Sequence, residues 1–469
     1  MAREMGLLET GVRVIEGVSL GPDDFVDVRF YESWTTTVLV RNGVVEQAAR
    51  QHVQGAAARA LLGGAWGFSS SSTWEPGDVG AAMERAVKLA RAVASRPHER
   101  VRVSRDAVYE GRGELQVRED PRAVPLEEKI GVAVRMERAI RGVGEAVKAA
   151  QVSLSDTVQR EVIVNSLGTR VETWACYVHC GALATASEAG LTQNAADSIS
   201  GGRGWETIGE ADVEAKGREV GERAARLLGA EKPPSGRMNI IMDPSLVGVF
   251  IHEAFGHASE ADLILANRSV LSGRLGSRVG VEAITVIDDP TIPGLRGSYA
   301  YDSEGTRARR RVLVERGVLK EHIHSLETAG MMGVEPNGGA RAMDHLSRPV
   351  IRMGNTIVLG GDMSLEELAE AVKDGIYLAK SYGGYVDTSR GQFYFSAQEG
   401  YLIRQGRIGP RVQNVSMSGL TLEVLENTVG VGRDVEVAFP GTCGKQGQWI
   451  PVAGGGPHLA VRGVVVGGR

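Results

Sequence analysis

The chain has 469 residues, 42% of them apolar, which is enough to bury a large core and favours two domains over one. Lysine and arginine number 53 against 58 aspartate and glutamate, so the net charge is -5. No long tract concentrates positive charge, which argues against nucleic acid as a direct partner because backbone phosphates require a basic face.

Neither a secretory signal nor a membrane span is expected. The first ten residues lack an uninterrupted apolar segment, and no window reaches the roughly 18 to 20 apolar residues that cross a bilayer. Cys176, Cys180 and Cys443 are too few and too unevenly spaced for a disulfide framework. We therefore expect a soluble, cytoplasmic protein with free thiols and no membrane partner.

The first half of the chain is predicted to be an α/β domain with antiparallel strands and long helices. Residues 24–56 alternate apolar and polar positions around Asn42-Gly43, a dipeptide typical of tight hairpin turns. Similar alternation over 159–190, with a turn at 165–168, predicts a second strand pair. Apolar residues at helical spacing predict three helices, over 80–96 with Asp78 as its cap, over 126–149, and over 211–228.

Pro233-Pro234 mark the predicted domain boundary, because two consecutive prolines remove backbone donors and force extended geometry. We predict an N-terminal domain over 1–235 and a C-terminal domain over 236–469. Just after the boundary, residues 238–242 predict a short buried strand, and Asp243 can cap a helix that has Pro244 in its first turn.

The C-terminal domain is predicted to contain a large curved antiparallel β-sheet, which makes the whole chain α+β. Its predicted strands are short, apolar and separated by glycine-rich turns, and they lie in 282–290, 309–323, 348–361, 391–409 and 458–468. One helix is predicted over 364–380, with Ser364 and Glu367 as a capping box. The arginines at 307 and 309–311 are interpreted as a solvated or ion-paired surface.

The stretch "GVFIHEAFGHASEAD" over 248–262 resembles a zinc-protease helix with its spacing lengthened by one residue. The familiar pattern places two histidines four residues apart, on one face of the helix. His252 and His257 are five apart, which on an ideal helix separates them by roughly 140°. A metal site here therefore predicts a distorted helix, such as a single π-type turn or an irregularity at Gly256.

A third metal ligand is available in Cys443, which stands among glycines in "FPGTCGKQGQ". A thiolate on a backbone that can approach closely suits zinc, and Lys445 could favour that thiolate. An ordinary loop cysteine is the alternative. Cys176 and Cys180 with His179 form another candidate cluster, but strand alternation puts the two thiols on one side and the imidazole on the other, so we interpret the cysteines as core residues.

Four tracts together resemble the TldD/PmbA family of metallopeptidases over nearly the full length of the chain. They are "GAWGFSSS" at 64–71, "HEAFGHASEAD" at 252–262, "RMGNT" at 352–356 and "CGKQGQ" at 443–448. The resemblance implies an active TldD-type subunit in which His252, His257 and Cys443 bind one zinc ion and Glu253 is the catalytic carboxylate. It also implies processing of small peptides in a cavity closed by a partner, either a paralogous PmbA-type subunit or a second copy of the chain.

These residues predict a zinc-dependent peptidase that hydrolyses small or unfolded peptides, with Glu253 as general base and a zinc-bound water as nucleophile. Glu260 and Asp262 are candidates for orienting a histidine ring, with a solvated helix end as the alternative. Two rival functions stay open. One is a non-catalytic partner subunit of a peptidase complex, and the other is a hydrolase that uses Cys443 as its nucleophile.

Overall fold

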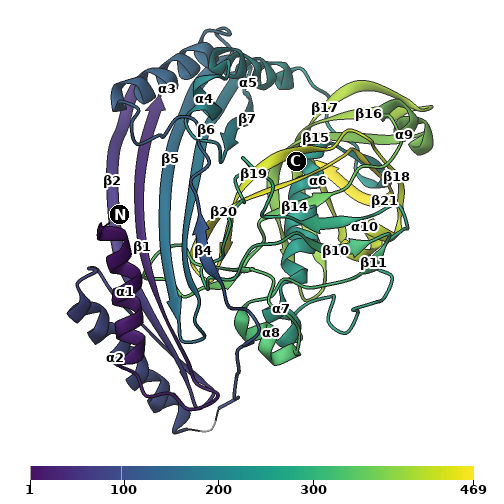
Figure 1. The fold of residues 1–469 in the computed structure, drawn as a ribbon. Coiled ribbons are helices and arrows are strands. Elements are labelled where there is room, and N and C mark those ends of the chain that lie inside the picture. Colours follow the sequence, from purple (N-terminus) through teal and green to yellow (C-terminus); the bar gives the residue numbers. More distant parts are fainter. Residues whose placement is uncertain (1, 97, 469) are drawn as a thin grey trace.

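The computed structural model describes residues 2–96 and 98–468. A long sheet and its helices stand beside a second body of strands that contains the C-terminus (Figure 1). The predicted α+β class is confirmed, with helices lying beside large antiparallel sheets. Among the helices of the described residues, none combines the length and the apolar character that crossing a bilayer requires.

The first of these sheets has seven strands within the described residues, in the order β3-β2-β1-β5-β6-β4, with β7 also paired to β6. Its strands are β1 (Phe25–Arg41), β2 (Val44–Leu62), β3 (Ala65–Ser71), β4 (Glu110–Gly113), β5 (Val147–Asn165), β6 (Arg170–Glu188) and β7 (Leu191–Gly201). The predicted hairpin at Asn42-Gly43 is confirmed, and both residues adopt positive φ, as this kind of turn requires. The predicted turn between β5 and β6 is confirmed too.

Helices cover one face of this sheet at its two ends. They are α1 (Ala2–Glu16), α2 (Pro76–Ala94), α3 (Leu126–Arg141), α4 (Glu206–Gly209) and α5 (Val213–Leu228). Alternate strand residues enter the cores below them, including Cys176 and Cys180, which confirms that these thiols are core residues. The opposite face, called here the inner face, carries polar side chains such as Thr157 and Gln159 and lies toward the C-terminal strands.

Two helix predictions in this half need correction, and one helix was missed. Helix α2 begins at Pro76 with Glu75 as its N-cap, so Asp78 lies inside the first turn, where a carboxylate favours the helix dipole. Helix α3 ends at Arg141 instead of continuing to 149, because Gly142 follows and β5 already begins at Val147. Helix α1 was not predicted at all.

The C-terminal strands form two six-stranded sheets and one two-stranded sheet among the described residues, where the sequence predicted one large sheet. The first six-stranded sheet contains β17 (Arg407–Leu420), β16 (Gln392–Arg404), β15 (Gly375–Asp387), β8 (Gly236–Met242), β21 (Leu459–Gly468) and β18 (Thr428–Val431). The second contains β11 (Val318–Leu319), β10 (Arg311–Glu315), β9 (Val286–Asp288), β14 (Asn355–Val358), β20 (Gln448–Gly456) and β19 (Glu436–Lys445). Strands β12 (Ala340–Arg341) and β13 (Val350–Ile351) form the small sheet. Because β17 also pairs with β21, five strands of the first sheet close into a ring.

Short helical segments lie between and around these sheets. They are α6 (Pro244–Phe250), η1 (Ile251–Gly256), η2 (His257–Ser259), α7 (Ala261–Leu265), α8 (Leu326–Met332), α9 (Leu365–Val372) and α10 (Thr421–Glu426). The capping box of Ser364 and Glu367 at the start of α9 is confirmed, but the helix ends at Val372 instead of 380. Lys373 adopts a φ of 64° at its end, and the chain then enters β15.

The arginine cluster is only partly at the surface. Arg307, Arg309 and Arg310 are exposed, as predicted, and Arg309 pairs with Glu321. Arg311 is instead fully buried and forms an ion pair of 2.5 Å with Asp288. The strand period explains this difference, because β10 turns alternate side chains into the core.

Asp197 joins the seven-stranded sheet to the C-terminal strands. Its carboxylate on β7 lies 3.2 Å from Lys380 of β15 and 3.2 Å from Arg223 of α5. We keep residue 236 as the proposed domain boundary, because it lies between the helices and strands of the seven-stranded sheet and the C-terminal strands. Burial opposes ionisation of Asp197, but the surrounding cations outweigh it and lower the pKa of this carboxyl to about 2.

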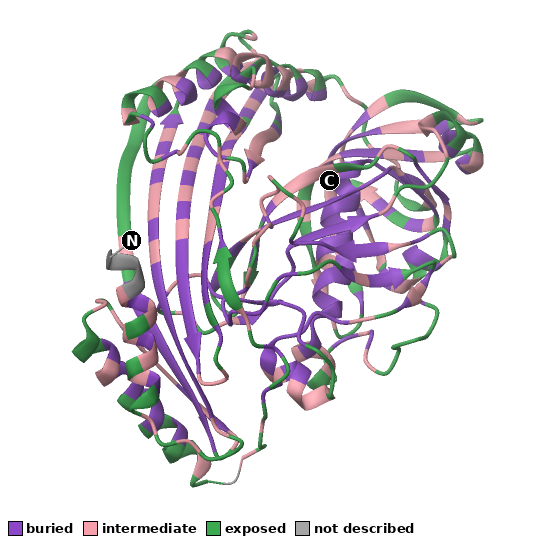
Figure 2. Cartoon of the chain, in the orientation of Figure 1, coloured by how far each residue is buried: buried purple, intermediate pink, exposed green. Residues whose placement is uncertain are grey.

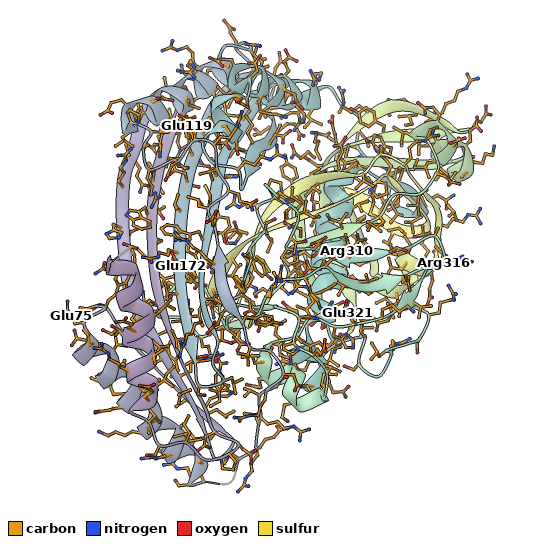
Figure 3. All side chains as sticks on the ribbon, viewed as in Figure 1. Glu75, Glu119, Glu172, Arg310, Arg316 and Glu321 are labelled. Atoms are coloured by element: carbon orange, nitrogen blue, oxygen red, sulfur yellow. The ribbon has the colours of Figure 1, made fainter. Side chains whose placement is uncertain are left out.

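Asp197→Asn is expected to lower the Tm at pH 7 by about 2–5 °C, because the folded state then loses a charge that the cations stabilise. The folded pKa lies below the unfolded value of about 3.9, so the contribution is present above about pH 4 and is lost as the pH falls toward 2. The difference in Tm between the variant and the wild type should therefore become smaller from pH 5 to pH 3, as measured by thermal unfolding. An unchanged difference across that range would contradict the assignment, and Glu119→Gln, at an exposed position labelled in Figure 3, is the control.

Candidate metal centre

The histidine stretch folds as an α-helix that widens into a π-turn. Asp243 caps α6 by accepting a hydrogen bond of 2.8 Å from the Leu246 amide, and Pro244 occupies the first turn. The next six residues, Ile251–Gly256, form the π-helix η1. Because a π-turn brings residues i and i+5 to one side, the rings of His252 and His257 lie 5.3 Å apart. The helix distortion predicted from their spacing is thus present.

A close approach of two backbones holds this helix against the strand next to Cys443. A Cβ built on Gly248 would lie 2.7 Å from the carbonyl oxygen of Gly454 in β20, nearer than real Cβ atoms come. Helix α6 also packs on β19, the strand that carries Cys443. Figure 2 shows this helix buried among the C-terminal strands. The backbone contact therefore fixes the distance between the two histidines and the cysteine strand.

Cys443, 186 residues after His257 in sequence, meets the two imidazoles. Its Sγ lies 3.1 Å from His257 Nε2, and one ligand atom from each of the three residues lies within 4.8 Å of the others. Tetrahedral zinc with bonds of about 2.1 Å to nitrogen and 2.3 Å to sulfur separates its ligand atoms by roughly 3.6 Å. The three predicted ligands are therefore brought together at a spacing that such an ion would fit.

His252 gives an independent indication that a ligand belongs here. The residue is fully buried, and neither of its ring nitrogens has a hydrogen-bond partner within the described part of the chain. A buried polar atom without a partner costs roughly 1–3 kcal/mol. A metal ion coordinated by one of these nitrogens would remove that cost, so the arrangement of the residues fits a metal.

The charges at the site also suit a cation. Burial opposes ionisation of the Cys443 thiol, but the two imidazoles outweigh it and lower its pKa to about 4. Cys443 is therefore a thiolate at neutral pH, which is the form that binds metal. Burial also opposes the charging of His257, yet Glu260 and Cys443 outweigh it and raise the pKa of this imidazole well above its usual value.

Glu253 lies at the edge of this cluster and stays accessible. Its carboxylate Oε2 is 3.9 Å from His257 Nε2, the same nitrogen that faces the sulfur. About a quarter of the Glu253 side chain is exposed, whereas the Cys443 residue is 2% exposed. A group in this position can exchange protons with water beside the three ligand atoms.

Glu260 and Lys445 support the site from behind. Glu260 is fully buried and its carboxylate lies 2.9 Å from His257 Nδ1, so it fixes the orientation of that ring. Lys445 Nζ lies 3.0 Å from Glu260 and 2.8 Å from Asp262. Burial opposes ionisation of Glu260, but His257 and Lys445 outweigh it and lower its pKa to about 2. Lys445 thus pairs with carboxylates instead of acting on the Cys443 thiol, and Asp262 supports Lys445 rather than a histidine.

Sequence reasoning missed Arg352. The residue is fully buried, and its guanidinium donates to the carbonyl oxygens of Cys443 and Gln448. These two residues lie on either side of the β19–β20 turn, so Arg352 fixes the hairpin that presents the sulfur. The tract 352–356 contributed to the family resemblance, but nothing in its local pattern indicated a long-range contact.

The alternative cluster of Cys176, His179 and Cys180 does not form. The two thiols point into the core beneath α3 and α5, while His179 lies on the inner face with its Nδ1 2.6 Å from Ser200 Oγ. Burial, reinforced by the charge of Arg296, lowers the pKa of His179 to about 4. Among the described residues, one group of three or more histidine, cysteine or acidic side chains has its ligand atoms close enough together to hold a metal ion. It consists of His252, His257 and Cys443.

Comparison with known proteins identifies the family of this chain. Residues 26–94, 119–228 and 235–468 match family models described as PmbA/TldA metallopeptidase domain 1, central domain and C-terminal domain. A protein of Methanothermobacter thermautotrophicus named metalloprotease is 40% identical over 95% of this chain and 96% of its own. A Saccharolobus solfataricus protein named zinc metalloprotease TldD homolog is 31% identical over 73% of this chain and 76% of its own.

A solved structure shares the fold. The structure of TldE from Thermococcus kodakarensis superimposes with a TM-score of 0.73 at 17% identity, over 99% of this chain and 100% of the other. At that identity the similarity concerns the fold alone. The three domain matches and the sequence relatives together show that the chain belongs to the PmbA/TldD metallopeptidase family.

Proposed function

We propose that the protein is a zinc-dependent peptidase that hydrolyses small or unfolded peptides. The observation that carries the proposal is the meeting of two imidazoles and one thiolate with a carboxylate 3.9 Å from His257. Imidazole and thiolate ligands together suit zinc. The name zinc metalloprotease given to the Saccharolobus solfataricus relative supports the same ion.

His252, His257 and Cys443 would hold the ion and leave a fourth position open. When bound, zinc supplies a Lewis acid that polarises a peptide carbonyl and acidifies water. Glu253 is the general base, because its accessible carboxylate can take a proton from the attacking water and return it to the leaving amine. Glu260 holds the His257 ring in place through Nδ1.

Two cavities beside the β19–β20 hairpin favour a peptide of limited size. One, of about 570 Å³, is lined by Phe439, whose ring lies 5.8 Å from that of His252. The other, of about 230 Å³, is lined by residues 449–451 of β20. Because β19 is an end strand of its sheet, an extended peptide can pair with its free edge.

A partner subunit is part of the proposal, either a paralogue or a second copy of the chain. The fold is shared with TldE, which supports a related partner. Residues 44–54 of β2 are almost all exposed, and β3 pairs only with residues 56–62, so this stretch has an unpaired edge (Figure 2). Such an edge is a place where another chain can dock. Native mass spectrometry distinguishes the two assemblies.

A thiol hydrolase is the second candidate because Cys443, His257 and Glu260 also lie in the order of a nucleophile, a base and an orienting carboxylate. Cys443 is 2% exposed, however, which leaves its sulfur little room to attack a carbonyl. The unpartnered nitrogens of His252 are also unexplained by this mechanism. We therefore favour the metallopeptidase.

Glu253→Gln should keep about one zinc ion per chain and lose peptidase activity by about 10²–10⁴-fold, because the amide cannot accept the proton. Metal analysis and hydrolysis of a quenched fluorescent peptide measure the two properties on the same sample. Full activity in the zinc-loaded variant would remove Glu253 from the mechanism.

Glu260→Gln should weaken zinc affinity by about 10–100-fold, because His257 loses the charged group that orients its ring. Competition with a chromophoric chelator measures the dissociation constant. Asp262→Asn is the matched control, since Asp262 contacts Lys445 but not a histidine, and it should weaken affinity less. Equal losses in the two variants would contradict a specific role for Glu260.

Chelation should abolish peptidase activity and added zinc should restore it. Iodoacetamide treatment of the chelated protein should prevent reactivation by zinc, whereas the zinc-loaded protein should keep its activity, because its Cys443 sulfur is then a ligand. Activity assays before and after each treatment separate the candidates. Insensitivity to chelators together with loss on alkylation would instead assign a thiol hydrolase.

A further inference from the structure

The smaller of the two cavities, of about 230 Å³, is lined by charged side chains that have no role in the proposed peptidase mechanism. It lies between the inner face of the seven-stranded sheet and the β19–β20 hairpin, and it is lined mainly by hydroxyl, amide and aromatic side chains. Two guanidinium groups, those of Arg296 and Arg341, also line it. Neither forms an ion pair with a carboxylate within the residues that the structure describes.

The acidic side chains of the same cavity are already engaged elsewhere. Glu161 pairs with Arg29 at 2.5 Å and accepts a hydrogen bond from Ser303. Asp302 accepts hydrogen bonds from the backbone amides of Glu304, Thr306 and Ala340, a set that holds its carboxylate in place. Neither carboxylate is therefore available to neutralise the two arginines.

Arg296 has more N–H donors without a hydrogen-bond partner than Arg341 has, among the described residues. Its Nε is buried and has no hydrogen-bond partner in the part of the chain that the structure describes, and Nη2 makes one long contact of 3.3 Å with Thr442 Oγ1. Arg341 instead donates to the Met353 carbonyl oxygen at 3.0 Å and lies over the ring of Tyr299. A guanidinium presents five N–H donors in a planar fork that matches a carboxylate. Arg296 is thus the group with donors left for a ligand.

The backbone around Arg296 is held rigidly. The Gly297 amide donates to Asn355 Oδ1 at 3.0 Å, and the Asn355 amide donates to the Ser298 hydroxyl and the Asp289 carbonyl. A Cβ on Gly297 would lie 2.1 Å from the Gly354 carbonyl oxygen, so the loop lies directly against the backbone that precedes β14. The backbone that carries Arg296 therefore needs little further ordering when a ligand binds.

The location connects Arg296 to the proposed active site. Its contact, Thr442, directly precedes Cys443 on β19. An extended peptide advances by about 3.3 Å per residue. A peptide bond at the metal centre would therefore place a carboxylate at Arg296 only a few residues along the substrate.

We propose that Arg296 binds a carboxylate of the peptide substrate, supplied either by the C-terminus or by an acidic side chain, and so selects which peptides enter the site. The inference rests on the proposed peptidase function. Arg341 contributes a second positive charge to the cavity lining, while its guanidinium lies over the Tyr299 ring and donates to the Met353 carbonyl oxygen.

Binding of labelled hexapeptides, followed by fluorescence anisotropy with zinc-loaded and with chelated protein, tests this without requiring hydrolysis. In the first pair, one peptide ends in a free carboxylate and the other in an amide. In the second pair, both peptides end in an amide, and one carries Glu where the other carries Gln. We expect the wild type to favour one acidic member by about tenfold or more, since a hydrogen bond to a charged group contributes about that factor. The pair that shows the preference identifies the source of the carboxylate.

Arg296→Gln should remove the preference while the zinc content, the Tm and the affinity for the neutral peptides stay unchanged. Arg296→Lys keeps the charge but not the fork and should retain part of the preference. Arg310→Gln, at an exposed position labelled in Figure 3, should leave the preference intact. A wild type without preference, or a preference that survives Arg296→Gln, overturns the inference. A preference without hydrolysis counts against the peptidase function and not against the carboxylate site.

Discussion

The candidate site depends on one irregular turn of helix. A regular α-helix would separate His252 and His257 by roughly 140°, whereas the π-turn Ile251–Gly256 puts both rings on the side that faces Cys443. A π-turn loses regular hydrogen bonds, so the surrounding structure must hold it in place. The Gly248 contact with Gly454 and the packing of η1 on β14, β15 and β20 provide that support.

A series of charges extends from the site, buried at Glu260 and partly exposed at Asp262. Glu260 contacts His257, Lys445 contacts Glu260 and Asp262, and each charge is balanced by its neighbour. Removing one member of such a series leaves an uncompensated buried charge, which costs more than the pair itself contributes. Lys445 lies two residues after Cys443, so the same series also ties the cysteine strand to the histidine segment. A change in these charges should therefore affect both the relative positions of His257 and Cys443 and the stability of the packing around them.

Much of the fold could be predicted from local sequence signals. The Asn42-Gly43 hairpin, the Asp243 cap and the Ser364 capping box each depend on a few adjacent residues, and all three are confirmed. Helix ends were less predictable, because the apolar spacing of α3 runs without a break into β5. The division of the C-terminal strands between two sheets depends on pairings such as β14 with β20, nearly 100 residues apart. For the same reason the partners of Arg352 and Lys445 lay outside what local patterns can indicate, whereas the spacing of the histidines did predict the distorted helix.

The choice between a metal centre and a thiol nucleophile turns on His252. A cysteine and one histidine at 3.1 Å, with a carboxylate behind the ring, satisfy the geometry of a thiol hydrolase without any contribution from His252. That mechanism would bury a second imidazole and leave both of its nitrogens without a hydrogen-bond partner, which is costly. His252, His257 and Cys443 would hold a cation that gives that imidazole a partner and neutralises the Cys443 thiolate. The accessible Glu253 carboxylate would then have a role as a base beside the ligands, a role that the thiol mechanism does not give it.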